Sequence, residues 1–195
     1  MGSYADDALF MSRNNIEYVE LISDDGKSKV MVIPAWQGRV MTTSAAGDEG
    51  DSYGWINYSF IKKRQIDLQF NPVGGEERFW LGPEGGVFSL YFRQGEKQIY
   101  KNWKVPPVLD IEAFKIQSQS KNCICLTKEG CLTNACGTTF YLNIKRTISL
   151  LDINEFAASF NLEFPKDIKA VAYKSDNQIT NIGNESWNKE TGLIS

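Results

Sequence analysis

Apolar and polar residues alternate along much of the chain. From Phe140 to Leu150 the even positions read Phe, Leu, Ile, Arg, Ile and Leu, while most odd positions are polar. From Phe156 to Phe164 the even positions are again apolar. A period of two is typical of half-buried antiparallel strands, so we predict a strand over each stretch and a turn at 151–155 between them. Further strands are predicted over 16–22, 29–34, 87–93, 112–118, 122–127 and 168–174.

Helical signals are few. Asp6 and Asp7 are suited to the first turn of a short helix that runs to Met11, and 55–63 can hold one or two further turns. We therefore expect a mostly β protein, an antiparallel β-sandwich, with under about a fifth of its residues in helices. No repeat or flexible linker divides the chain, so residues 1–195 are expected to form a single domain. Leu193-Ile194 has the character of a further strand, which predicts an N-terminal portion of a larger domain, incomplete at its C-terminus.

Composition narrows the possible functions. The 195 residues are 42% hydrophobic and 23% charged, with a net charge of −3, as in ordinary globular domains. A mildly acidic chain without a run of Lys and Arg lacks the charge typical of nucleic-acid-binding proteins. No apolar stretch approaches the ~20 residues of a membrane span. The start, MGSYADDALF, has no signal-peptide features; the compartment is unknown, and a periplasmic or secreted location is favoured if MGS replaced a leader.

The chain contains no histidine, which removes the commonest general acid–base and the commonest zinc ligand. Its four cysteines, Cys123, Cys125, Cys131 and Cys136, lack the paired C-x2-C spacing of zinc ribbons. We predict buried, reduced structural thiols, with a metal site or a pair of disulfides as the alternatives. No metal and no cofactor are expected.

The stretch from Gly74 to Gly86, GGEERFWLGPEGG, combines a permissive backbone with large aromatic residues and opposite charges. Its glycines allow positive φ or a close backbone approach, and its glutamates and Arg78 supply acceptors and a planar donor group for hydroxyls. One interpretation is a ligand-binding loop in which Trp80 stacks on a sugar ring. The other is a scaffold, in which Arg78 pairs with Glu76 or Glu84 and Trp80 belongs to the core.

Two more arginines stand in strand-like segments. Arg146 interrupts the apolar face of 140–150. A buried arginine is costly unless it is paired, so we expect an internal ion pair there, with a position in a cleft as the alternative. Arg39 follows Trp36, and its charge likewise needs a partner or a polar cleft.

Several stretches together resemble a bacterial family of uncharacterised proteins related to aldose 1-epimerases. They are VMVIPAWQGRVMTTSAAGDEGDSYGWIN, NPVGGEERFWLGPEGGVFSLYF and LTNACGTTFYLNIKRTISLL. GGEERFWLGPEGG is similar to the Gly-Gly-x-x-Arg-x-Trp-x-x-Pro-Glu pattern of mutarotase-like domains, and GRVMT at 38–42 is similar to the strand that opens that fold. The resemblance runs from about Asp6 to the end of the chain. It implies the galactose mutarotase-like supersandwich.

The resemblance also implies a carbohydrate ligand. Aldose 1-epimerases use a histidine acid and a late glutamate base, and this chain has no histidine. We therefore expect a carbohydrate-binding protein without turnover by this chain alone, and we assign no catalytic residue. The alternatives are a sugar epimerase or related enzyme that uses its carboxylates, and a protein-interaction module. The expected ligand-binding residues are Arg39, Trp55, Asn57, Glu76, Arg78, Trp80 and Glu84.

Overall fold

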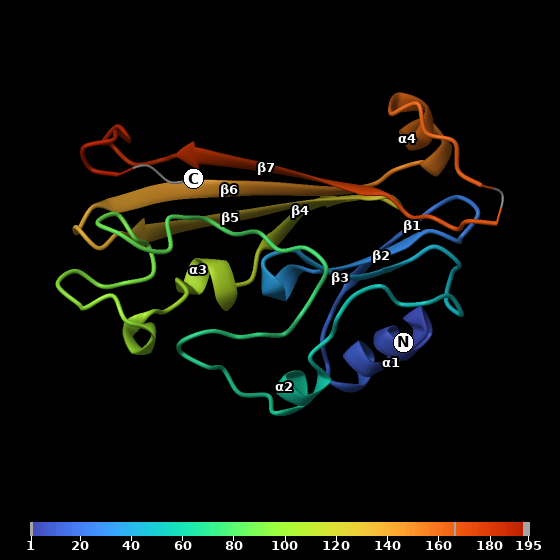
Figure 1. The fold of residues 1–195 in the computed structure, drawn as a ribbon, viewed down its shortest axis with the longest axis horizontal. Helices are drawn as coiled ribbons and strands as arrows, with labels where there is room; N and C mark the ends of the chain where they lie inside the picture. The colour runs from blue at the N-terminus through green and yellow to red at the C-terminus, as the bar shows by residue number, and fades with distance from the viewer. Residues whose placement is uncertain (1, 166, 193–195) are drawn as a thin grey trace.

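The computed structural model describes residues 2–165 and 167–192 and is mostly β, with two antiparallel sheets (Figure 1). The smaller sheet has the order β1-β2-β3. Its strands are β1 (Val19–Ile22), β2 (Lys29–Ile33) and β3 (Arg39–Ser44). The larger sheet has the order β4-β5-β6-β7. Its strands are β4 (Lys115–Gln119), β5 (Cys123–Thr133), β6 (Thr139–Leu150) and β7 (Tyr173–Asn181).

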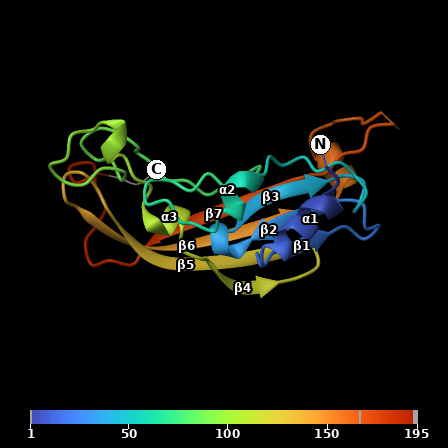
Figure 2. The same ribbon diagram turned by 90° about the horizontal axis from the view of Figure 1, so that it is seen from below.

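The three-stranded sheet is buried on both faces. β2 and β3 are buried at every position, in keeping with the nearly continuous apolar run of β2. Val30 and Val32 face the core shared with the four-stranded sheet. Met31 and Ile33 face a second core, closed by helix α1 (Tyr4–Arg13). Figure 2 shows α1 and α2 (Tyr58–Lys62) lying over this sheet, on the side away from the long strands.

The four-stranded sheet is half-buried. β6 alternates buried even positions with outward residues that are mostly polar, which is the period-two pattern of a sheet with one solvated face. The smaller sheet covers only part of the inner face of the four-stranded sheet. Loops between α2 and β4 cover the rest; they lie below the left half of the long strands in Figure 1. These loops contain η2 (Tyr100–Asn102) and α3 (Pro107–Asp110), and η1 (Pro34–Trp36) joins β2 to β3. The loops between α2 and β4 add Phe79, Leu81 and Tyr91 to the main core.

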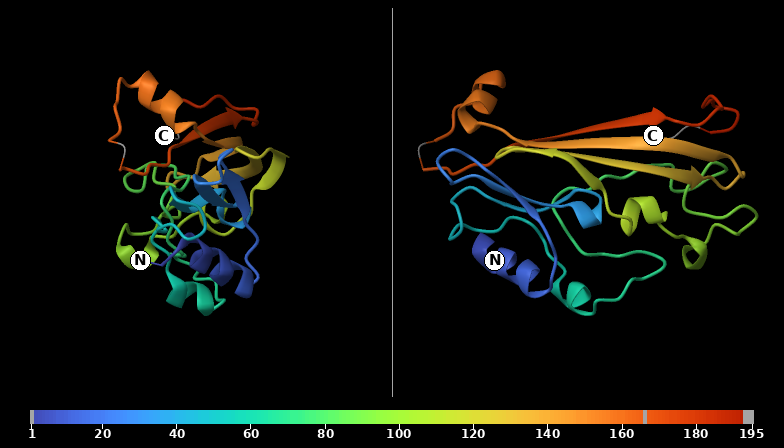
Figure 3. Two further views of the ribbon diagram at one scale, coloured as in Figure 1. Left: turned by 90° about the vertical axis from the view of Figure 1, so that its right-hand side faces the viewer. Right: turned by 180° about the vertical axis from the view of Figure 1, so that it is seen from behind.

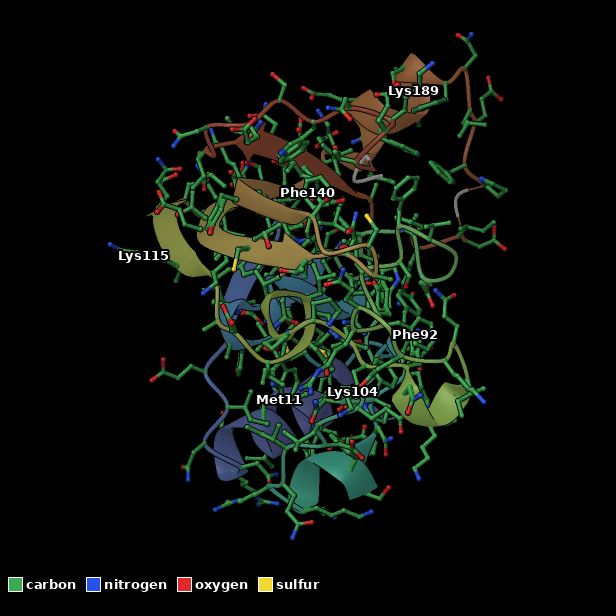
Figure 4. The ribbon with its side chains drawn as sticks, turned by 90° about the vertical axis from the view of Figure 1, so that its left-hand side faces the viewer. Met11, Phe92, Lys104, Lys115, Phe140 and Lys189 are labelled. Carbon is green, nitrogen blue, oxygen red and sulfur yellow. The ribbon has the colours of Figure 1, made fainter. Side chains whose placement is uncertain are left out.

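The two edge strands of the larger sheet are β4 and β7. β4 is exposed at all five positions, and Figure 4 shows Lys115 pointing away from the body of the molecule. Lysine on an edge strand discourages pairing with another chain. On the opposite edge, β7 begins after α4 (Ile153–Ser159), which projects at one end of the sheet (Figure 3).

Most predicted strands are confirmed with shifted ends. The predictions at 16–22, 29–34, 112–118, 122–127 and 140–150 correspond to β1, β2, β4, β5 and β6, and GRVMT lies in β3. The helices cover 10, 5, 4 and 7 residues, so the expected low helical content is confirmed for the described residues. None of the described helices is long and apolar enough to cross a membrane. Leu193-Ile194 lies outside the described residues.

Three predictions of local structure are wrong. The stretch 156–164 is helical at its start, because Asp152 caps α4 by accepting from the backbone N–H groups of Asn154 and Glu155. The strand predicted at 168–174 lies later, as β7. The stretch 87–93 is a loop, in which the Ser89 hydroxyl bonds the carbonyl of Glu84 and takes over local hydrogen bonding.

Candidate functional site

The GGEER segment lies beside the outer edge of β3. Val40 donates to the carbonyl of Glu77 at 3.0 Å, and Glu76 donates back to the carbonyl of Val40 at 2.9 Å. These bonds continue the three-stranded sheet by a short fourth segment. The segment therefore has a fixed position next to Arg39, the first residue of β3.

A second segment, 53–57, packs against the same edge. Tyr53 donates to the carbonyl of Thr43 at 3.1 Å, and Gly75 donates to the carbonyl of Trp55 at 2.8 Å. Gly74 has φ +97°, and a Cβ there would lie 2.2 Å from the Trp55 carbonyl oxygen. Only glycine permits this contact, which explains the first glycine of GGEER.

A buried hydrogen-bond network holds 52–58 in place. Asp7 of α1 is buried and accepts from the hydroxyls of Ser52 and Tyr58. The Thr42 hydroxyl contacts Ser52 and accepts from the N–H of Gly54 at 2.9 Å. Burial, and then the bond to Asp7, raise the pKa of Tyr58 to about 12. The network ties α1, β3 and α2 to the segment that carries Trp55.

Tyr53 and Trp55 present their rings to solvent. Trp55 is 64% exposed and Tyr53 is 48% exposed, whereas Ile56 is buried in the second core. The chain bends at Gly54, between the two residues, so their exposure and not strand alternation identifies them as surface rings. Trp55 is the more exposed of the two, and its backbone carbonyl accepts from the N–H of Gly75.

Asn57 and Glu76 have local hydrogen bonds. Asn57 caps α2, because its side chain accepts from the N–H of Phe60 and donates to the carbonyl of Pro72. The exposed Glu76 accepts from the Thr43 hydroxyl at 3.0 Å. Asn57 therefore contributes to structure, while Glu76 still presents its carboxylate at the surface.

Arg146 is fully buried and forms the expected internal ion pair. Its partner is Glu77. The remaining donors of Arg146 bond the carbonyl of Gly38 at 3.1 Å and the side chain of Asn177 at 2.7 Å. Ser175 also donates to Glu77 at 3.3 Å. The pair connects the GGEER segment to β6 and β7.

Arg78 does not pair with Glu76 or Glu84, so that expectation is wrong. It donates to the carbonyl of Leu109 at 2.7 Å and lies 3.5 Å from the buried Asp110 of α3. Asp110 also accepts from the Asn71 backbone and side chain. Glu84 instead accepts from the indole N–H of a partly buried Trp80 at 2.8 Å.

The Trp80 ring packs against Arg78, Tyr91 and Phe70. The Arg78 guanidinium carbon lies 4.1 Å from its centroid, and the Tyr91 ring lies 5.3 Å from it. Cation–π contact and aromatic stacking each stabilise such an arrangement. Trp80 thus supports Arg78, and the exposed ring of Trp55 is the freer stacking surface.

Arg39 is buried without a carboxylate partner. It is 3% exposed, and its Nη1 donates to the carbonyl of Gly74 at 2.6 Å. Its Nε has no hydrogen-bond partner, and neither has Nε of Arg78. Within the described residues, no acidic oxygen lies within 4.0 Å of Arg39. Burial, and then the nearby charge of Arg78, lower the pKa of Arg39 to about 9.

The fold brings the predicted residues together around 74–78 to different degrees. Arg39, Glu76 and Arg78 belong to the segment or contact it, and the backbone of Trp55 bonds Gly75. Trp80 is connected to the segment through Arg78, which lies over its ring, and Glu84 is connected through its hydrogen bond from Trp80. The sequence analysis missed Asp7, Tyr53, Asp110, Ser175 and Asn177, which reach the site from distant parts of the chain.

Two cavities can be compared with the positions of the predicted ligand-binding residues. One of about 310 Å³ has Asn71, Val73 and Asp110 in its wall and so borders the Arg78–Asp110 pair. One of about 620 Å³ lies at the other end of the long sheet, beside Tyr141 and Trp187. None of the seven predicted ligand-binding residues lines either cavity.

The cysteines do not form a site. All four thiols are free, and no group of His, Cys, Asp or Glu within 2–165 and 167–192 is arranged to hold a metal ion. Cys125 is buried as predicted, but Cys131 and Cys136 are exposed, so burial is wrong for those two. Cys131 lies on the outward face of β5, and Cys136 lies in the turn before β6.

Comparison with known proteins gives one family. A model described as "Family of unknown function (DUF6786)" matches residues 2–195. No curated protein and no solved structure matches the chain.

Proposed function

Because the chain belongs to the DUF6786 family, whose function is unknown, we propose a function from the site itself: binding of a carbohydrate at the surface formed by 53–57 and 74–78. The exposed ring of Trp55 carries the proposal, and Tyr53, two residues earlier, is exposed as well. An exposed indole offers a flat apolar face to the C–H face of a sugar ring. Glu76 adds an accessible acceptor for hydroxyl groups.

The rigidity of this surface supports the proposal. Gly74 and Gly75 bring the two segments into backbone contact, and Asp7 holds the far end of 52–58 through Ser52 and Tyr58. A binding surface that is ordered before the ligand arrives loses less conformational entropy on binding. An exposed tryptophan on a fixed segment is therefore a suitable ligand contact.

The motif resemblance to mutarotase-like domains supports the same proposal. Under it, the two packed sheets correspond to part of an antiparallel β-sandwich of the galactose mutarotase-like kind. Glu77 and Glu84 are engaged with Arg146 and Trp80. Burial raises the pKa of Glu76, but one such carboxylate does not form the acid–base pair that catalysis by carboxylates uses, so we favour binding over catalysis. Catalysis and protein interaction stay as alternative predictions.

The test is binding of the purified protein to a glycan array, followed by titration of each bound sugar. We expect Trp55→Ala to weaken binding by at least about tenfold, while the unfolding midpoint stays near that of the parent because the ring is exposed. Tyr100→Ala removes an even more exposed ring, at 77% against 64% for Trp55, and serves as the control. Absence of any bound sugar, or equal loss in both variants, would contradict the proposal.

A further inference from the structure

We propose that a further cavity, of about 450 Å³, binds a small carboxylate with an apolar body, such as a medium-chain fatty acid or an aromatic acid. None of the seven predicted ligand-binding residues lines this cavity. The proposal therefore concerns a second site, and it stands whether or not the protein binds a carbohydrate.

Three segments of the chain surround the cavity. They are 90–94, 102–107 and the end of β5 with the turn that follows it, 131–134. Backbone hydrogen bonds connect these segments, since Lys104 donates to the carbonyl of Tyr91 at 2.9 Å and Ala135 donates to the carbonyl of Ser89 at 2.8 Å. The cavity is therefore formed before a ligand binds, and its volume lies in the range of about 300–1,000 Å³ that is typical of small-molecule sites.

Side chains of the main core give the cavity an apolar wall. Leu90, Phe92, Val105 and Leu132 line it, and all four belong to that core; Phe92 is labelled in Figure 4. Leu68 also lines the cavity and is 79% exposed, so the cavity is open to solvent beside this residue. An apolar chain or ring that enters there is removed from water by contact with these side chains, which favours binding.

The same wall is positively charged. Arg93 and Lys104 line the cavity and are exposed, and none of the described lining residues is Asp or Glu. Within residues 2–165 and 167–192, neither Arg93 nor Lys104 forms an ion pair. The whole chain has 24 acidic and 21 basic residues, so a wall with two cations and no carboxylate departs from the average of the chain. A carboxylate would form charge-assisted hydrogen bonds to these cations, which are about twice as strong as neutral ones.

The uncharged polar side chains of the wall are engaged in other bonds. Gln94, Asn102 and Asn134 each donate a side-chain amide to a backbone carbonyl, at 3.3, 2.9 and 2.9 Å. The Thr133 hydroxyl bonds that of Thr139 at 2.9 Å. A neutral ligand with many hydroxyls would compete with these bonds, whereas the two cations are available without such competition. The ligand expected here therefore differs from the carbohydrate proposed for the first site.

Titration calorimetry with two series of probes tests the site. Within a series the apolar body is kept and the head group changes: octanoate, octanamide and octylamine, and then phenylacetate, phenylacetamide and phenethylamine. We expect the acid of at least one series to bind about tenfold or more tightly than its amide, and the amine to bind more weakly than the amide. Acetate has the head group without the body and should bind at least about tenfold more weakly than that acid.

Variants locate the binding. Arg93→Gln and Lys104→Gln should each weaken binding of the acid, and the double variant should bind acid and amide alike. Leu68→Asn should weaken binding of both. All three positions are exposed, so the unfolding midpoints should stay near that of the parent. Lys101→Gln removes an exposed lysine that does not line the cavity; it is the matched control and should bind the acid as the parent does.

The outcomes are distinct from those of the carbohydrate experiment, because Trp55→Ala should bind the acid as the parent does. Equal binding of acid and amide by the parent overturns the proposal, and so does acid binding that the double variant or Leu68→Asn leaves unchanged. Acetate that binds as tightly as both acids shows an adventitious ion only and overturns it as well. Absence of binding by either acid does the same.

Discussion

At the scale of single residues, Arg39 and Arg146 have opposite energetic roles. Both are buried, but only Arg146 has a carboxylate partner. Arg146→Met would leave Glu77 without its cation, and we expect a loss of about 3 kcal/mol in the free energy of unfolding. Arg39→Met removes an uncompensated charge, so we expect its free energy of unfolding to equal or exceed that of the parent. Urea unfolding of both variants measures the difference.

The comparison depends on the contrast between the two variants. If Arg39→Met loses as much stability as Arg146→Met, then Arg39 contributes to the scaffold and its lack of a carboxylate partner has no cost. A residue that lowers stability while remaining buried is typical of a functional position.

Tyr58 predicts how stability depends on pH. Its pKa is raised to about 12 in the folded protein, above the ordinary value of about 10. Between these values the folded state holds a proton that the unfolded state has lost, so stability falls as pH rises through this window. Below it, the contribution of Tyr58 is fully present.

We therefore expect the advantage of the parent over Tyr58→Phe to shrink from near pH 9 to near pH 11. Chemical unfolding at both pH values measures it, and each comparison is made at one pH so that the other tyrosines cancel. If the advantage grows with pH instead, the pKa of Tyr58 is lower in the folded protein than in the unfolded chain, which would contradict the prediction.

At the scale of elements, the backbone contact between 53–57 and 74–78 determines the shape of the site. Gly74→Ala would force a Cβ against the Trp55 carbonyl, and we expect a loss of about 2–4 kcal/mol together with weaker sugar binding. Gly86 also has positive φ, at +84°, but nothing lies within 4 Å of its Cβ position. Gly86→Ala should cost only about 1 kcal/mol.

The difference between these two glycine variants isolates the close approach from backbone strain alone. Thermal unfolding and sugar titration of both variants test it. Equal effects on stability and binding would mean that positive φ is the whole reason for the glycine at 74.

Sequence periodicity predicted the elements whose burial is regular. β6 alternates along its whole length, and its prediction at 140–150 is confirmed. The stretch 156–164 has the same alternation, but Asp152 caps a helix there. The hydrogen bonds of this cap outweigh an alternation that is only nine residues long. Arg146 was predicted to pair because its charge interrupts an apolar face. Its partner Glu77 was not predictable, since 69 residues separate them.

At the scale of the whole molecule, the two cores share one sheet. Alternate residues of β2 enter opposite cores, with Val30 and Val32 in one and Met31 and Ile33 in the other. Neither core can open without exposing part of β2. We therefore expect one cooperative unfolding transition.

Far-ultraviolet and near-ultraviolet circular dichroism, recorded through the same urea titration, should give coincident midpoints. Two separated midpoints would show that the cores unfold independently, against the prediction of a single domain. Ile33→Ala, in the second core, should lower both midpoints together.

The Arg146–Glu77 pair has a consequence for how the strands find their alignment. A shift of β6 by one residue would turn Arg146 to the solvent face and leave the inner face of the sheet with Glu77 uncompensated. Hydrophobic side chains tolerate several arrangements, whereas a buried charge tolerates few. We therefore expect misaligned chains to be selectively disfavoured during folding, so that this one ion pair acts as a proofreading contact between β6 and a segment 69 residues away.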